Sequence, residues 1–342
     1  MVKPSEQILL ESGVRFVFRM DASPTIGVGH AIRCVALAEE MESLGFSSIF
    51  VGRTSSIGWL EELIDSIPRT IRVESEELFE IENGSDILVL DSYHLEPNSG
   101  FIKSLPWKAT AAIVDNSTPN YLVDIYIHPG ENYGWQLPQV KGKRIILEGL
   151  NYVPIRKSIT SIQHEVRENT ETKIVTVVGG GTDPTKFIES IIPVLQDLEV
   201  NFEARIFTSN RNLSTLDSRI KILSPEDKIE QHFSDSDIVI TTGGISAWEV
   251  ASMGIPMGIA SAVENQNSNY EFFTSKGWAL GIGMYENCGW SFSIENLKLL
   301  LTSRDILRSI SREQKSASLK NGCSRIAHDL AEAVVRTEVS KG

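Results

Sequence analysis

Short apolar runs alternate with helical patterns along the 342 residues of the chain, and this alternation limits the possible folds more than any other feature. The runs have the length of strands and are continuously apolar, which is typical of strands buried on both faces of a sheet. Strands of that kind that are joined through helices form parallel sheets with right-handed crossovers. The sequence therefore predicts an α/β protein with parallel sheets.

The expected elements form two series along the chain. Candidate strands cover 14–18, 48–51, 87–90, 111–114 and 125–127 in the first series, and 174–178, 202–206, 220–223, 238–241, 257–259 and 279–281 in the second. Candidate helices cover 32–44, 59–67, 186–197, 228–234, 247–253, 268–276 and 294–302.

A break between the two series predicts two domains. Residues 157–172 are polar and charged, lack apolar periodicity and are expected to form a linker. An N-terminal Rossmann-like domain is expected over 14–156 and a C-terminal one over 173–322, followed by a helix over 323–342. Ligands bind outside the carboxyl ends of the strands in such sheets, so we expect the motifs at those ends to form one site.

Composition and charge exclude several classes of protein. The formal net charge is −13 and basic residues form no long block, which argues against a nucleic-acid surface. No apolar run approaches the roughly 20 residues of a membrane span, and the first ten residues lack the pattern of a signal peptide. The cysteines (Cys34, Cys288 and Cys323) are widely separated, and no histidine–carboxylate cluster has metal spacing. We expect a cytoplasmic monomer without a metal or cofactor.

A glycine-rich motif follows the first expected strand. Residues 18–37 read FRMDASPTIGVGHAIRCVAL, with Gly27, Gly29 and His30 at the point where a helical pattern begins. Backbone N–H groups there lie next to the positive end of a helix dipole, and an imidazole can move a proton near neutral pH. The alternative is a tight turn in which His30 caps the helix. The residues leave both interpretations open.

A second glycine motif, GGGTDP over 179–184, follows the strand expected at 174–178. Gly180 and Gly181 permit a close approach of the backbone to a ligand, and Pro184 suits the first turn of a helix. The alternative is an ordinary turn with Asp183 as the helix cap.

The motif GGISAWE over 243–249 gives a stronger signal. Gly243, Gly244 and Ser246 stand at a helix N-terminus, where they can direct several donors at a diphosphate. Glu249 lies about one turn further on, and its carboxylate can accept hydrogen bonds from both ribose hydroxyls. The alternative for Glu249 is a favourable charge in the first helical turn, worth roughly 0.3–1 kcal/mol.

Two further polar segments follow expected strands. Asn265 and Gln266 come after 257–259, and the asparagine amide suits sugar hydroxyls or N-acetyl groups; the alternative is a loop asparagine. Tyr93 lies in the segment DSYH, which follows 87–90.

These motifs resemble those of the nucleotide-sugar hydrolases of pseudaminic acid biosynthesis and of the related spore-coat polysaccharide proteins. The first motif matches at Arg19 and Asp21, at the G-x-G-H and at the Arg33–Cys34 pair. The later motifs are similar to the family's G-G-[ST]-D-P, its helix-opening glycine pair and its Asn-Gln. The stretch 149–156 resembles the family's interdomain segment G-x-x-Y-x-x-x-R, in which Tyr152 and Arg156 match the tyrosine and the arginine.

The resemblance implies a GT-B fold, with two Rossmann-like domains whose parallel sheets face across a cleft and a C-terminal helix that packs back on the first domain. It also implies cleavage of UDP-2,4-diacetamido-2,4,6-trideoxy-β-L-altrose to free sugar and UDP, with His30 as the catalytic base. The sugar contacts that it implies are Arg19, Asp21, Gly27, Gly29, Tyr93, Asp115, Asn265 and Gln266. Gly180, Gly181, Gly243, Gly244, Ser246 and Glu249 would bind the nucleotide.

Two segments depart from the family pattern. Asp115 stands alone where the family has paired aspartates. The segment 124–130, which reads DIYIHPG, differs from the corresponding loop sequence of the family. Both are expected to face the sugar, so the nucleotide half matches better than the sugar half. Two alternatives therefore stay open: a GT-B glycosyltransferase that uses a UDP- or CMP-sugar, and a nucleotide-sugar-binding protein without turnover.

Overall fold

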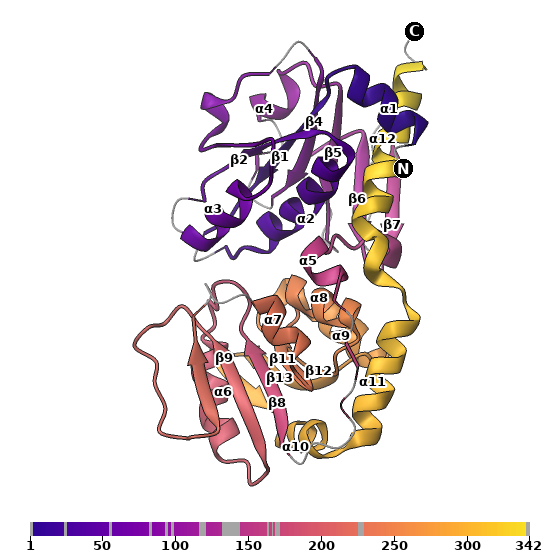
Figure 1. The fold of residues 1–342 in the computed structure, drawn as a ribbon. Coiled ribbons are helices and arrows are strands. Elements are labelled where there is room, and N and C mark those ends of the chain that lie inside the picture. The colour runs from indigo at the N-terminus through magenta and orange to yellow at the C-terminus, as the bar shows by residue number, and fades with distance from the viewer. Residues whose placement is uncertain are drawn as a thin grey trace. The chain divides into compact units, whose positions relative to one another are not determined.

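The computed structural model describes residues 3–23, 26–54, 57–81, 84–92, 95–96, 99–115, 121–131, 144–162, 164–165, 167, 172–224 and 229–339. The chain forms two compact units (Figure 1). Unit 1 comprises Met1–Lys157 and Asn321–Gly342, and unit 2 comprises Ser158–Lys320. Each unit is built on one sheet, so each is described by itself.

The sheet of unit 1 has seven parallel strands in the order β3-β2-β1-β4-β5-β6-β7. The strands are β1 Arg15–Met20, β2 Ser47–Val51, β3 Thr70–Val73, β4 Asp86–Asp91, β5 Ala109–Ile113, β6 Ile125–Pro129 and β7 Ile145–Gly149. The helices are α1 Pro4–Glu11, α2 Gly29–Leu44, α3 Gly58–Asp65, α4 Gly100–Lys103 and α12 Gly322–Val339, with the 3-10 turns η1 Glu76–Leu78 and η2 Leu150–Tyr152. α12 packs against α1 and α2, so the last helix of the chain belongs to unit 1 (Figure 1).

The sheet of unit 2 has the order β10-β9-β8-β11-β12-β13-β14. Its strands are β8 Lys173–Val178, β9 Phe202–Phe207, β10 Ile220–Leu223, β11 Ile238–Thr242, β12 Met257–Ser261, β13 Leu280–Glu286 and β14 Gly289–Phe292, of which β14 alone runs antiparallel to its neighbour within this described sheet. The helices are α5 Lys157–Thr160, α6 Phe187–Gln196, α7 Ile229–Ser234, α8 Ile245–Met253, α9 Asn267–Ser275, α10 Ile294–Thr302 and α11 Arg304–Ser316, with η3 Glu264–Gln266 and η4 Leu319–Asn321.

Both sheets place their first strand next to their fourth, which is the strand order of doubly wound α/β domains. β4 is buried along its whole length, and Phe16, Val17 and Phe18 of β1 are buried beside it. β11 and β12 are buried in the same way in unit 2. In each unit the crossovers lead away in opposite directions from the first and fourth strands, which are β1 and β4 in unit 1 and β8 and β11 in unit 2. Domains of this kind bind ligands outside the carboxyl ends of such a strand pair.

The predicted α/β class is confirmed, and the edge strand β10 was predicted at 220–223, but the sequence missed the other three edge strands. β3, β7 and β14 were not expected, because edge strands alternate between exposed and half-buried residues and lack a continuous apolar run. The predicted parallel strands are confirmed, and β14 adds an antiparallel edge strand to the sheet of unit 2. The strand expected at 125–127 is confirmed as β6, which extends to Pro129, so most of the segment 124–130 that was expected to face the sugar belongs to the sheet. Asp124 precedes that strand and binds the Thr110 N–H and hydroxyl at 2.9 and 2.8 Å, so it lies at the amino end of the sheet.

Two histidines that belong to none of the sequence motifs are buried. His128 on β6 is 1% exposed and His164 is 5% exposed. His164 Nε2 donates a hydrogen bond of 2.7 Å to the Ser236 carbonyl, which fixes the proton on that nitrogen. Burial lowers the pKa of both imidazoles, so both favour the neutral form.

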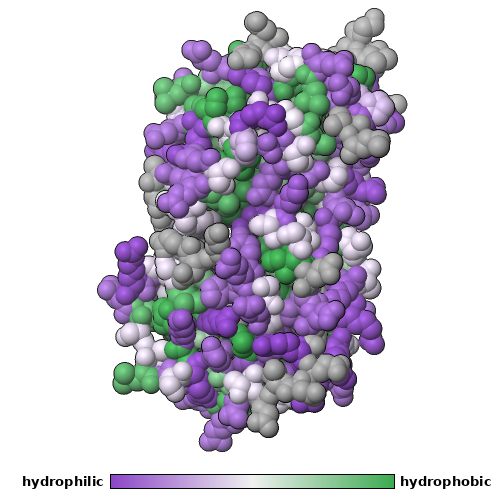
Figure 2. Space-filling model, in the orientation of Figure 1, coloured by the Kyte–Doolittle hydropathy of each residue, from purple (hydrophilic) through white to green (hydrophobic). Residues whose placement is uncertain are grey.

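Hydrophilic side chains predominate on the face drawn in Figure 2, and hydrophobic ones lie there in small groups. Among the residues that the structure describes, no helix combines the length and apolar character needed to cross a bilayer. The predicted monomer stays a prediction.

Candidate active site

His30 is the second residue of α2 and pairs with the last residue of β4. Its Nδ1 lies 2.6 Å from Asp91 Oδ1, and both side chains are almost completely buried. A carboxylate at this distance assigns the proton to Nδ1, which leaves the lone pair on Nε2. The carboxylate also fixes the plane of the ring. β1 and β4 are neighbours in the sheet, so the loop after β1 delivers His30 to the end of β4.

Arg33 completes this group from the next turn of α2. Its Nε donates to Asp91 Oδ2 at 2.8 Å and one terminal nitrogen donates to Asp91 Oδ1 at 2.6 Å. Its other terminal nitrogen donates to Asp115 Oδ1 at 2.5 Å. The guanidinium therefore holds the Asp91 carboxylate in a fixed orientation while it links β4 to the end of β5. Asp115 is 27% exposed in its side chain and is the accessible member of the cluster.

A second ion-pair group lies at the end of β1. Arg19 donates to Asp21 Oδ1 and to Glu76 Oε1, both at 2.7 Å, and to the Met20 carbonyl at 2.8 Å. The Ser92 hydroxyl donates to the other oxygen of Asp21. Burial alone would raise the pKa of Asp21, but the hydrogen bonds from Ser92 and Arg19 outweigh it and lower the pKa. Asp21 thus stays ionised and joins the loop after β1 to the loop after β4.

The two glycines of the first motif have separate roles. Gly27 has φ of +94°, and its N–H donates to the Ser23 carbonyl at 2.9 Å, so it closes the turn before α2. Gly29 is the first residue of α2. Val28, and not His30, is the N-cap residue of α2, and His30 lies inside the helix as its second residue, so the capping alternative does not fit the position of His30.

Two neighbouring groups keep their protons. Burial raises the pKa of the Cys34 thiol well above its ordinary value, and the charge of Asp91 adds to the effect. Burial also raises the pKa of Tyr121, whose hydroxyl donates to the Ser92 carbonyl at 3.2 Å. Cys34 therefore lacks the thiolate that a nucleophile needs, and His30 is the group in this cluster suited to take a proton.

In unit 2, the two glycine motifs meet at the ends of β8 and β11. Gly180 has φ of +81°, and a methyl group there would lie 3.7 Å from Thr242 Oγ1 at the end of β11. Gly181 lies in the same turn. Gly244 precedes α8, and no side chain caps that helix. The first N–H groups of α8 thus point away from the helix without a side-chain cap, in the arrangement that binds phosphate.

Gln266 covers the glycine pair from η3. Its Oε1 accepts from the Ala262 N–H at 3.2 Å, and its Nε2 would lie 3.6 Å from a methyl group placed on Gly244. Asn265 precedes it and is exposed at the end of β12. The structure therefore brings the glycine pair and the Asn-Gln segment together.

Ser246 and Glu249 both lie on α8. Ser246 is half-buried in the first turn, whereas Glu249 is buried, 3% exposed, one turn later. Glu249 is beyond the first turn of the helix, so the alternative of a favourable first-turn charge has little support.

The GGGTDP motif departs in two ways from the ligand-binding turn and helix start that the sequence predicted. Asp183 accepts from the Phe187 and Ile188 N–H groups at 2.7 and 2.9 Å, so it caps α6 as the alternative supposed. Pro184 lies before that helix rather than in its first turn, because α6 begins at Phe187. The turn is longer than expected since Asp183 and Lys186 both adopt positive φ.

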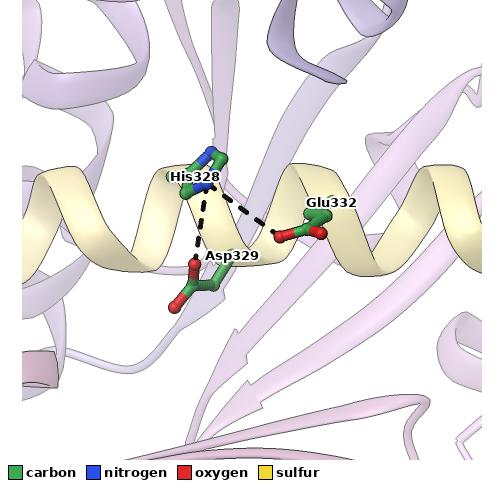
Figure 3. Close-up of side chains that lie close together, drawn as sticks. All are labelled: His328, Asp329 and Glu332. Carbon is green, nitrogen blue, oxygen red and sulfur yellow. Dashed lines mark ion pairs between the residues drawn. The ribbon is translucent and has the colours of Figure 1, made fainter. Parts of the chain in front are cut away.

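Some expected residues lie outside the described part of the chain, namely Tyr93, His94 and 116–120. Two residues of the cluster were not expected in the site, Asp91 and Arg33. The sequence carries a signal for Asp91, which directly follows the buried run of β4 at the strand end facing His30. The expectation of no histidine–carboxylate cluster is also wrong, because His328, Asp329 and Glu332 lie together on α12 (Figure 3).

Comparison with solved structures defines the fold class. The chain has the GT-B fold: MurG of Acinetobacter baumannii matches 93% of it with a TM-score of 0.57 and 14% identity, over 99% of the MurG chain. A UDP-N-acetylglucosamine 2-epimerase matches 93% of it with a TM-score of 0.55 and 13% identity, over 95% of that chain. The fold class expected from the resemblance is thus confirmed.

The curated relatives are distant, and no protein-family model matches the chain. The UDP-2,4-diacetamido-2,4,6-trideoxy-beta-L-altropyranose hydrolase of Campylobacter jejuni is 22% identical over 78% of this chain and 98% of its own length. The spore coat polysaccharide biosynthesis protein SpsG of Bacillus subtilis is 23% identical over 76% of this chain and 81% of its own. An uncharacterized Methanocaldococcus jannaschii protein, MJ1062, is 23% identical over 75% of this chain, which spans 57% of that relative.

Proposed function

We propose that this chain is a nucleotide-sugar hydrolase that cleaves a UDP-linked diacetamido-trideoxy-hexose, or a related amino sugar, to free sugar and UDP. The observation that carries the proposal is the buried His30–Asp91 pair at the carboxyl ends of β1 and β4. The distant similarity to a named hydrolase of such a sugar, over almost its whole length, supports the substrate class. The activity would belong to nonulosonic acid or surface polysaccharide biosynthesis.

In the proposed reaction, His30 activates a water molecule. Nε2 takes a proton from water as the water oxygen attacks the anomeric carbon, and the bond from that carbon to the diphosphate oxygen breaks. UDP leaves with the electron pair, and attack opposite to it inverts the anomeric centre. Asp91 stabilises the imidazolium that forms, and Arg33 holds Asp91 in place. A positioned base of this kind contributes roughly 10²–10⁴-fold to the rate.

We propose that unit 2 binds the nucleotide. The uncapped N-terminus of α8, with Gly243, Gly244 and Ser246, would donate to the diphosphate and stabilise the charge that grows on it. Gly180 and Gly181 would line the same site, since their turn adjoins the end of β11. Glu249 would accept hydrogen bonds from the ribose hydroxyls.

We divide the expected sugar-binding residues by whether their side chains are accessible or already held in ion pairs within the protein. Asp115 of unit 1 and Asn265 of unit 2 are accessible, and each is proposed as a sugar contact. Tyr93 and Gln266 are proposed as further sugar contacts, as the resemblance implies. Arg19 and Asp21 are held within their ion-pair group, so they are proposed to shape the loop that carries Gly27 and Gly29.

Incubation with a panel of UDP- and CMP-sugars, without any acceptor, tests the proposal. We expect equal amounts of free sugar and UDP from a UDP-linked amino sugar. In water labelled with heavy oxygen, the label should enter the sugar, because water attacks carbon. Release of UDP only when an acceptor alcohol is added would instead identify a glycosyltransferase, an activity that many GT-B structures similar to this chain carry in their names. Tight binding without any product would identify a binding protein.

A further inference from the structure

α12 carries a group of metal-type ligands away from the His30 cluster. His328 Nε2 lies 4.0 Å from both Asp329 Oδ1 and Glu332 Oε2, and the three ligand atoms all lie within 4.8 Å of one another. Figure 3 shows the three side chains converging from adjacent turns of the helix. The spacing i, i+1, i+4 makes this possible, since residues four apart share a helix face.

A residue outside the trio holds each of the three side chains. The Tyr152 hydroxyl donates to Asp329 Oδ2 at 2.6 Å, and Arg336 donates to Glu332 Oε1. Glu6 Oε1 lies 3.7 Å from His328 Nδ1, while the other oxygen of Glu6 accepts from the Lys3 N–H at 2.6 Å. Each of these outside residues contacts one atom of its partner. The other atom, which is His328 Nε2, Asp329 Oδ1 or Glu332 Oε2, faces the other two members of the trio.

The ring of His328 gives an independent indication of a ligand. Its Nδ1 is buried and has no hydrogen-bond partner among the described residues, although buried polar atoms are normally paired. The buried carboxylate of Glu6 lies just beyond hydrogen-bond distance of it. A cation on Nε2 would fix the proton on Nδ1 and favour its donation to Glu6, which is how metal-binding histidines are usually supported.

We propose that His328, Asp329 and Glu332 bind a first-row divalent cation of the zinc type. Imidazole nitrogen with two carboxylate oxygens suits zinc better than magnesium or calcium, which take oxygen ligands. Bonds of about 2.0–2.2 Å require the ligand atoms to approach to about 3.4 Å, so each carboxylate must move roughly 0.6 Å closer to His328 Nε2 than its present 4.0 Å. The bound ion would connect α12, through Glu6 and Tyr152, to α1 and η2. Its role would be to stabilise unit 1, independently of the proposed hydrolysis.

Calorimetric titration with zinc and thermal unfolding test the site. The titration is made on a Cys288→Ser background, because Cys288 is an exposed thiol that could bind zinc itself. We expect one zinc per chain and a melting temperature raised by about 5 °C at a hundredfold excess over the dissociation constant. Magnesium should cause no rise, and a chelator should reverse the effect of zinc.

Matched variants separate the site from unspecific binding. His328→Gln and Glu332→Gln should each weaken zinc binding by at least about tenfold. Glu6→Gln should weaken it about 10–100-fold, as for other supporting residues of metal ligands. Glu11→Gln removes the same charge from the exposed end of α1 and should leave the affinity unchanged. Lack of saturable binding, or equal affinity in wild type and His328→Gln, would overturn the proposal.

Discussion

At the scale of single residues, the two ends of β4 show how position decides the role of a carboxylate. Asp86 accepts from Arg15 Nε and a terminal nitrogen at 2.8 and 2.7 Å, and Asp91 accepts from Arg33 in the same forked manner. Both aspartates are completely buried. Only the carboxyl end of a parallel sheet offers a crevice for ligands, so Asp91 alone is expected to serve the chemistry.

We predict that Asp91→Asn lowers turnover of the UDP-sugar by at least about 100-fold while UDP still binds. Asparagine keeps the shape of aspartate but removes the charge that orients and stabilises the His30 imidazolium. Steady-state rates and UDP affinity, measured by calorimetry, check this.

The control is Asp86→Asn. It breaks a similar buried ion pair, so it should lower the melting temperature, but kcat should stay near the wild-type value. Equal losses of kcat in the two variants would show that Asp91 acts only through stability.

The sequence predicted His30 as the candidate base, whereas Asp91 and Arg33 were not predicted as its partners. The glycine motif marks a strand-to-helix turn, and that turn places a histidine at the ligand edge. Asp91 and Arg33 were visible as neighbours of motifs, but only the packing of β1 against β4 shows that they bind each other. Asp183 illustrates the opposite case, because a residue in a phosphate-type motif proves to cap α6.

At the scale of secondary-structure elements, the N-terminus of α8 is the expected anion site. We predict that Gly244→Ala weakens UDP binding by about tenfold with little change in the free energy of unfolding. Gly244 has φ of −85°, and its nearest neighbour would be 3.6 Å from the new methyl group, so alanine fits the fold. The methyl group would, however, stand where the backbone is proposed to approach the diphosphate.

Gly58→Ala is a matched control, since Gly58 begins α3 and a methyl group there would meet nothing within 4 Å. Its UDP affinity should equal that of the wild type. Unchanged affinity in Gly244→Ala would place the diphosphate elsewhere.

The segment before β11 contains a pH-sensitive contact. Burial lowers the pKa of His164 below its ordinary value of 6.5, so the unfolded chain takes up this proton first as the pH falls. Stability from neutral His164 is therefore present above about pH 6.5 and is lost below it. The limiting slope is about 1.4 kcal/mol per pH unit.

We predict that His164→Gln makes the unfolding free energy less dependent on pH between about 7 and 5. Glutamine can still donate to the Ser236 carbonyl but does not titrate. Denaturant unfolding at several pH values checks this, and an unchanged slope would show that His164 contributes nothing to acid sensitivity.

The edges and amphipathic helices of the fold were the hardest elements to predict. α11 is rich in charged residues, with only a narrow buried stripe that includes Leu307 and Ile310, so its sequence resembles an exposed segment. The central strands were predicted well because burial on both faces demands a continuous apolar run.

At the scale of the whole molecule, the two units have the same strand order. The sequence motifs nevertheless predict different ligands for them, the sugar for unit 1 and the nucleotide for unit 2. We predict that UDP raises the melting temperature and that UMP does so less, because the two glycine turns of unit 2 favour a diphosphate. Binding to the folded state stabilises it by about 2.7 kcal/mol at a hundredfold excess over the dissociation constant. An absent shift at millimolar UDP would contradict a uridine nucleotide site.

The repeat of the αβ series was sufficient to predict two sheets from the sequence alone. Nothing in that pattern identifies the sugar, because Asp115 stands alone in a loop that departs from the family. One of the curated relatives, 22% identical to this chain, carries a substrate in its name, and a similar substrate for this chain is a proposal.

The most direct test of the account compares wild type with His30→Asn in the hydrolysis of a UDP-linked diacetamido sugar without an acceptor. The account predicts that wild type releases free sugar and UDP, and that the variant folds, binds UDP and turns over at least about 100-fold more slowly. The side-chain amide of asparagine can still donate to Asp91, and Arg33 keeps its own hydrogen bonds to that carboxylate, so the variant should retain the fold. Hydrolysis by His30→Asn at close to the wild-type rate would contradict the central claim.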